Sequence, residues 1–169
     1  MRIRPATNQD ADAIRRVVFG VLAEYGLTAE HRGVDVDLED IAGNYFARGG
    51  LFEVVEDGER GIVGCVGLYP KEDGVCELRK MYLLPDMRGK GIGRQLLDRV
   101  LKEARQRGFR RMELETSSKL VEAKAMYRRY GFTSYRAPHL ALRCDEAFYL
   151  DLSATSPTPP HSDQQNHKS

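Results

Sequence analysis

The chain has 169 residues, of which 41% are hydrophobic and 30% are charged, and its formal net charge is +1. This length predicts one domain that can bury a core without disulfide or metal support. No apolar run is long enough to span a membrane, and residues 1–5 lack the apolar core of a secretory signal, so we expect a cytoplasmic protein with no membrane partner.

The cysteines and histidines predict no metal site. Cys65, Cys76 and Cys144 form no Cys-x-x-Cys pair and have no histidine cluster beside them. Ligand spacing typical of zinc sites is therefore missing, as is the pattern of a disulfide framework. We expect the three thiols to be small buried side chains.

Hydrophobic periodicity in the first half predicts two helices and four strands. A short strand at Ile3 is followed by a helix whose apolar face runs from Ile14 to Tyr25, and a second, shorter helix covers 38–46. Strands at 51–56 and 61–69 are separated by Asp57-Gly58, a strong hairpin signal. A fourth strand covers 75–84 and ends at Pro85.

The second half alternates helices and strands. A helix of about four turns begins at Ile92 and ends before Gly108, a strand covers 112–116, and a helix through 123–130 ends at Gly131. Strands at 132–136 and 147–152 are expected to pair. The order predicts a mixed α/β domain over 1–152, and the Ser, Thr, Pro and Gln content of 153–169 predicts a disordered tail.

The most informative segment is Arg88-Gly89-Lys90-Gly91-Ile92-Gly93, which follows a strand and begins a helix. Glycines allow positive φ, so successive backbone N–H groups can face one anion at a helix N-terminus, where Arg88, Lys90 and Arg94 add charge. The nucleotide-triphosphate loop is excluded because Gly91 follows Lys90, and a dinucleotide fingerprint is excluded because Arg94 replaces its third glycine. Two interpretations of the segment remain: a pyrophosphate site or a solvated turn.

A second motif, Ala123-Lys124-Ala125-Met126-Tyr127-Arg128-Arg129-Tyr130-Gly131-Phe132, decides between them. With the glycine segment it resembles the GCN5-related N-acetyltransferase (GNAT) superfamily, whose members carry Arg/Gln-x-x-Gly-x-Gly/Ala and Ala-x-x-x-Tyr-x-x-x-Gly-Phe. The strand order agrees over residues 2–152. The resemblance implies the GNAT fold, a mostly antiparallel sheet of six to seven strands flanked by about four helices, and acetyl transfer from acetyl-CoA to an amine, without a metal.

The resemblance also implies which residues hold acetyl-CoA. The glycine segment would bind the pyrophosphate, and the strand backbone would pair with the pantetheine arm, with an N–H near Leu83 facing the thioester carbonyl. Leu120 stands where many relatives have asparagine, so Ser117 or Ser118 is expected to replace that hydrogen bond. The expected binding residues are Met81, Tyr82, Leu83, Arg88, Gly89, Lys90, Gly91, Ile92, Gly93, Arg94, Ser117, Ala123 and Tyr127.

Two catalytic residues are expected in a direct attack without a covalent intermediate. An amine with a pKa near about 10.4 must lose a proton, and Glu77 matches the position of the glutamate base in several family members. Strand alternation would place Glu77, Arg79, Met81 and Leu83 on one face; a Glu77–Arg79 surface pair is the alternative. Tyr127 matches the tyrosine that protonates the thiolate, or it serves only in the core.

The resemblance implies that the first two helices and their connecting loop, residues 25–48, shape the acceptor site. Asp35, Asp37, Glu39 and Asp40 lie there and favour a cationic amine, or else form a solvated face. A non-catalytic acyl-CoA-binding or sensing protein of the same fold is the alternative function. A basic run from Arg94 to Arg111 suggests a nucleic-acid partner. We do not expect one, because the run has no interleaved aromatic residues before Phe109. A homodimer is left open.

Overall fold

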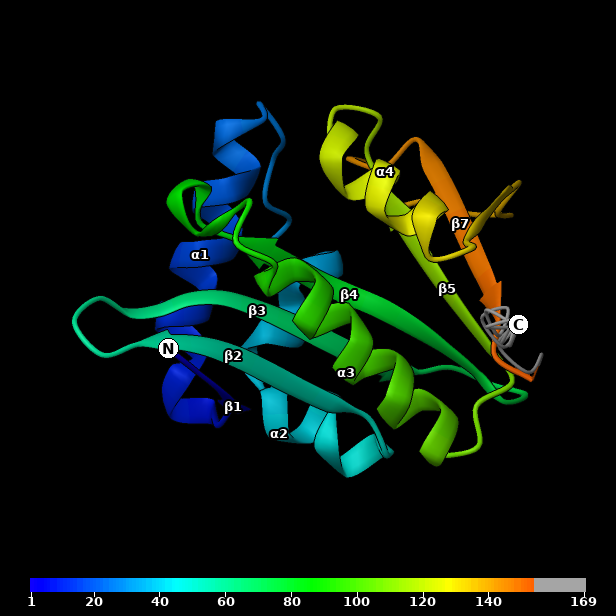
Figure 1. The fold of residues 1–169 in the computed structure, drawn as a ribbon, viewed down its shortest axis with the longest axis horizontal. Coiled ribbons are helices and arrows are strands. Elements are labelled where there is room, and N and C mark those ends of the chain that lie inside the picture. The colour runs from blue at the N-terminus through cyan, green and yellow to red at the C-terminus, as the bar shows by residue number, and fades with distance from the viewer. Residues whose placement is uncertain (154–169) are drawn as a thin grey trace, which may run out of the picture.

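The computed structural model describes residues 1–153, so the tail predicted at 153–169 lies, from residue 154 on, outside the described residues. Its centre is one seven-stranded sheet in the order β1-β2-β3-β4-β5-β7-β6 (Figure 1). Neighbouring strands are antiparallel except β4 and β5, which are parallel. The predicted mixed and mostly antiparallel sheet is confirmed.

The strands follow the predicted segments closely. Most boundaries differ by a residue or two, while β6 is shorter than predicted at three residues. The strands are β1 Arg2–Pro5, β2 Leu51–Asp57, β3 Gly61–Pro70, β4 Val75–Leu83, β5 Arg111–Thr116, β6 Thr133–Tyr135 and β7 Glu146–Asp151.

Helices cover both faces of the sheet, as Figure 1 shows with α3 and α4 in front and α1 behind. Helices α1 (Ala11–Glu24) and α2 (Ile41–Asn44) pack on one face, where Ile14, Leu38 and Phe52 belong to one core cluster. Helices α3 (Ile92–Gln106) and α4 (Val121–Arg129) cover the other face, where apolar residues of α3 meet β5 residues such as Met112 and Leu114.

The parallel contact between β4 and β5 is short. It pairs Val75 with Arg111, Cys76 with Met112 and Glu77 with Glu113, and no further pairs follow. Beyond this point β4 continues to Leu83 while β5 stays paired with β7, and the two strands diverge (Figure 1). The second half of β4 therefore has a free backbone edge.

A bulge at Lys80 corrects the predicted alternation along β4. Lys80 has φ +52°, and the register with β3 shifts between Gly67↔Arg79 and Cys65↔Tyr82. One extra residue reverses the side-chain alternation after the bulge. Met81 and Leu83 accordingly pack against the α3 cluster, while Tyr82 packs against the α1 cluster. The prediction that Glu77, Arg79, Met81 and Leu83 share one face is wrong.

The basic run along α3 is partly used in the fold. Arg99 forms two hydrogen bonds with Glu53, and Arg107 donates to the carbonyls of Gly49 and Gly50 at 2.8 Å each. These cations anchor α3 to β2 rather than form one free surface. None of the helices in residues 1–153 is long and apolar enough to cross a membrane.

Candidate active site

The glycine segment forms a tight turn from β4 into α3. A single 3-10 turn at Pro85–Met87 redirects the chain, and Gly89 and Gly91 adopt φ +75° and +82°. Gly91 is the N-cap of α3, and its carbonyl accepts the hydrogen bond from Gln95 N–H that begins the helix. The next amides at the start of α3 lack partners within the helix, so they can bind an anion.

These glycines line a large outer cavity of about 710 Å³ between α3 and α4. A Cβ built on Gly93 would lie in ordinary contact with Met126 Sδ at 3.7 Å and Leu83 Cδ1 at 3.8 Å, so Gly93 lies close to both of these side chains of the cavity wall. The volume lies within the usual range for small-molecule sites. Polar amides at one end and apolar side chains along the rest fit the pyrophosphate and pantetheine arm of acetyl-CoA.

The free edge of β4 lies along this cavity. Leu84 N–H pairs with the Val63 carbonyl, whereas the Leu83 carbonyl accepts from Arg88, so Leu83 faces away from β3. Because a residue's N–H and C=O point to the same side of a strand, we expect the N–H of Leu83 at the open edge. Met81, two residues earlier, also lines the cavity.

Arg88 is held by the protein on all sides. Its guanidinium donates to both carboxylate oxygens of Glu24 at 2.8 Å, to Tyr25 Oη at 3.1 Å, and to the Leu83 carbonyl at 2.9 and 3.1 Å. The hydrogen bonds to Glu24 raise the pKa of Arg88. Arg88 thus ties the glycine segment to the end of α1 and to β4, which is a positioning role rather than a free positive charge.

Replacing Arg88 by Gln should raise the KM for acetyl-CoA about fivefold, because the loop loses a charge-assisted clamp. Glu24→Gln, which keeps the bonds to Leu83, should raise the same KM less. Steady-state kinetics with a fixed amine measures both. A lower KM in Glu24→Gln would mean instead that freed Arg88 binds the phosphate directly.

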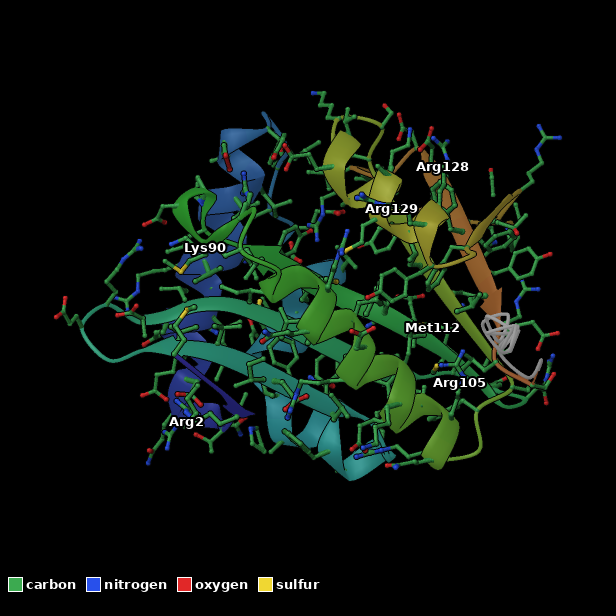
Figure 2. All side chains as sticks on the ribbon, in the orientation of Figure 1. Arg2, Lys90, Arg105, Met112, Arg128 and Arg129 are labelled. Atoms are coloured by element: carbon green, nitrogen blue, oxygen red, sulfur yellow. The ribbon has the colours of Figure 1, made fainter. Side chains whose placement is uncertain are left out.

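The other basic residues near the loop differ in position. Arg94 lines the outer cavity, and so does Arg129, which the sequence interpretation did not include. Figure 2 places Lys90 on the loop before α3 and Arg129 across from it on α4. Ile92 is buried in the α3 core and contributes only backbone to the site. Ser117 is also buried, and it lines a different, inner cavity.

The inner cavity, of about 50 Å³, adjoins the outer one through five common residues: Met81, Tyr82, Leu120, Ala123 and Tyr127. Tyr127 therefore stands between the two. Burial raises the pKa of Tyr127, so its hydroxyl stays protonated and can donate. Among residues 1–153 its hydroxyl has no hydrogen-bond partner, unlike those of Tyr45 and Tyr135. Leu120 precedes α4 and adds an apolar wall to both cavities.

Glu77 and Glu115 lie in different surroundings. Glu77 accepts a hydrogen bond from Arg79 Nε at 2.5 Å, has Lys71 Nζ at 3.7 Å, and lines neither cavity. Glu115 lines the inner cavity together with Tyr127. Burial, and next the charge of Glu77, raise the pKa of Glu115 above its usual 4.5. A carboxyl with a raised pKa in a cavity is typical of an acid–base group.

The acidic residues expected to attract the acceptor are mostly used in the fold. Asp35 is bound by Arg143 and Lys80, and Asp37 by Tyr45 and Lys80. Asp40 accepts from Gly43 N–H at 2.9 Å and from Asn8. Asp35 and Asp37 are buried, whereas Glu39 and Asp40 are exposed.

The buried Asp35 predicts a specific acid sensitivity. Burial raises its pKa, but the bonds from Arg143 and the Glu30 N–H, with the charge of Lys80, outweigh burial and lower the pKa to about 2. Because this pKa is depressed, the ionised Asp35 stabilises the fold above about pH 4, and this stabilisation is lost as the pH falls toward 2. The difference in unfolding free energy between the parent and Asp35→Asn should shrink by about 2 kcal/mol from pH 5 to 2. Urea unfolding at each pH measures it, and a constant difference would contradict it.

Comparison with known proteins agrees with this geometry. The model of the acetyltransferase (GNAT) family matches residues 21–132. The uncharacterized N-acetyltransferase YjgM of Escherichia coli is 43% identical over 136 residues, covering 77% of this chain and 80% of that protein. The aminoalkylphosphonate N-acetyltransferase of Salmonella typhimurium is 30% identical, covering 77% and 83%.

Solved structures share the fold. A GNAT-family acetyltransferase from Staphylococcus aureus has a TM-score of 0.83 at 23% identity, covering 89% of this chain and 98% of that one. The acetyltransferase yncA from Salmonella typhimurium, solved with its cofactor acetyl-CoA, has a TM-score of 0.68 at 26% identity, covering 95% and 98%. The chain belongs to the GNAT family of acetyltransferases. The expected enzyme class, and acetyl-CoA as its donor, are confirmed at the level of the family.

Proposed function

We propose that the protein transfers the acetyl group of acetyl-CoA to a primary amine, with the donor in the outer cavity and the amine in the inner one. The observation that carries this proposal is the position of Tyr127 at the junction, facing both cavities, with a carboxylate, Glu115, on the inner side. The donor supplies an activated thioester carbonyl when bound.

Glu115 is proposed as the group that takes the proton from the ammonium form of the acceptor. Its carboxylate belongs to the inner cavity, and its raised pKa makes it a stronger base than an exposed glutamate. Glu77 is paired with Arg79 and has Lys71 nearby, lines neither cavity, and its charge acts on Glu115 from outside the cavity. Glu77 remains in this proposal as an electrostatic neighbour.

The backbone and Tyr127 are proposed to manage the other charges. The N–H of Leu83 at the open edge of β4 donates toward the thioester oxygen as negative charge develops there. The Tyr127 hydroxyl donates a proton to the leaving thiolate, whose conjugate acid has a pKa of about 8.5, and the proton that the acetylated nitrogen loses restores the tyrosine. Gly91, Gly93 and Arg94, with the first amides of α3, bind the pyrophosphate.

The kind of acceptor follows from the inner cavity. Asp35, Asp37, Glu39 and Asp40 do not line the inner cavity, whereas Glu115 does and can face an ammonium group there. We propose a primary amine of small cross-section as the acceptor. The relative that acts on aminoalkylphosphonates supports a small amine, because it covers most of this chain.

Release of free thiol from acetyl-CoA, measured with a panel of primary amines, tests the proposed function. We expect saturable turnover on at least one amine and mass spectrometry showing a gain of one acetyl group. Tyr127→Phe should lower kcat about tenfold at pH 7 and less above pH 9, where the thiolate needs no proton. Tight acetyl-CoA binding by calorimetry without turnover on any amine would instead favour a non-catalytic acyl-CoA-binding protein.

A further inference from the structure

A buried ion pair joins two loops that are far apart in the sequence. Arg143, between β6 and β7, donates two hydrogen bonds to Asp35, between α1 and α2, at 2.6 and 2.9 Å. The Asp35 side chain is 0% exposed and that of Arg143 is 8% exposed. Such a paired fork fixes both the distance and the orientation of the two loops.

Asp35 is anchored from its other side as well. It accepts from the Glu30 N–H at 2.8 Å, and Lys80 Nζ lies 3.1 Å from Oδ1. Lys80 also lies 3.2 Å from Asp37 Oδ1 and donates to the Val34 carbonyl. Lys80 therefore fixes the α1–α2 segment to the bulge of β4, and the Asp35–Arg143 pair fixes the β6–β7 loop to that segment.

The joined loops form part of the wall of the inner cavity. Leu27 comes from the α1–α2 segment, while Arg143 and the neighbouring Cys144 come from the β6–β7 loop. The same loop contacts Glu115, which accepts a hydrogen bond from the Ala141 N–H. The cavity of about 50 Å³ has room for an aminomethyl group, since a water molecule takes about 30 Å³ in the liquid.

We propose that the Asp35–Arg143 pair is a specificity determinant, which restricts the acceptor to primary amines on an unbranched carbon. The pair holds the loops so close together that a methyl group on the carbon bearing the amine meets the wall. The inference rests on the proposed function, and it names a substrate class within it. One additional methyl group in a closed pocket changes kcat/KM by about 10- to 200-fold.

Two isomeric amines provide the test, n-butylamine and sec-butylamine, which differ only in branching at the amine carbon. The variant Asp35→Asn with Arg143→Met removes the pair and leaves Lys80 its partner Asp37. The control Glu53→Gln with Arg99→Met removes a similar two-bonded pair that lines neither cavity. The ratio of kcat/KM, linear over branched, should fall at least tenfold in the first variant and stay unchanged in the control.

Several outcomes separate this inference from the proposed function. If the double variant is folded and active and its ratio of kcat/KM, linear over branched, is unchanged, the inference alone is overturned. The same holds if a higher KM for acetyl-CoA accounts for the whole change in that ratio. Absence of turnover by the parent on every amine overturns the proposed function and the inference together. If the double variant does not fold, Arg143→Lys, which keeps the charge without the fork, should give an intermediate ratio, and a parental ratio there overturns the inference.

Discussion

Replacing Glu115 by Gln should lower kcat/KM for the amine at least 100-fold near pH 7, with the KM for acetyl-CoA unchanged. General base catalysis contributes about 10² to 10⁴ in rate, and the amide cannot accept the proton. The substitution keeps the shape of the cavity that Glu115 shares with Tyr127. Steady-state kinetics with both substrates varied measures the two constants separately.

The pH profile adds a second criterion. Because burial and Glu77 raise the pKa of Glu115, the acidic limb of kcat/KM should lie above the usual carboxyl range and should disappear in Glu115→Gln. Glu77→Gln is the matched control. Loss of its negative charge lowers the pKa of Glu115, so the limb should move to lower pH while the maximal rate is kept within a fewfold.

The opposite pattern would identify the other carboxylate. If Glu77→Gln lost 100-fold or more and Glu115→Gln retained its rate and limb, Glu77 would be the base, acting through water past Arg79. The proposal for Glu115 would then be wrong.

Replacing Gly91 by Ala should raise the KM for acetyl-CoA about tenfold. Gly91 has φ +82°, where an L-residue is strained by about 1–2 kcal/mol. A Cβ there meets no atom within 4 Å, so the effect comes from the backbone alone. The alanine variant relieves strain by turning the amides at the start of α3 away, and binding of the pyrophosphate must reverse this change.

Gly61→Ala is the control for that substitution. Gly61 has φ +79°, also has open space around it, and lies at the start of β3. Both variants should lose similar thermal stability, but only Gly91→Ala should lose affinity in a calorimetric titration with acetyl-CoA. Equal affinities for the two variants would show that the amides of this loop do not bind the pyrophosphate.

Local patterns predicted most of the fold. The Asp57-Gly58 hairpin, the long apolar face of α3 and the glycine at the start of that helix each depend on residues a few positions apart. The bulge at Lys80 was missed because its cause is distant: the ammonium group is held by Asp35 and Asp37, more than 40 residues earlier. Nothing within β4 itself indicates the extra residue.

In the site, too, the residues in local motifs could be predicted, whereas those positioned by distant contacts could not. The glycine segment and Tyr127 were identifiable, and both line the outer cavity. Glu115 had a weaker signal, the alternation of β5 that places it opposite the buried Met112 and Leu114 and thus toward the other face. Which glutamate enters the inner cavity depends on where β4 and β5 separate. Whether Arg129 lines the outer cavity depends on how α4 faces α3. Both are tertiary properties that one sequence does not reveal.

The short joint between β4 and β5 has a consequence for how the site forms during folding. Residues 51–83 are a local antiparallel meander, whereas the joint is a parallel pairing of segments about 36 positions apart, with α3 between them in the sequence. Contacts of longer sequence separation form at a greater loop-closure cost. Residues of both halves line each cavity. We therefore expect the site to be complete only when this joint is closed, and a bound donor to favour the closed joint.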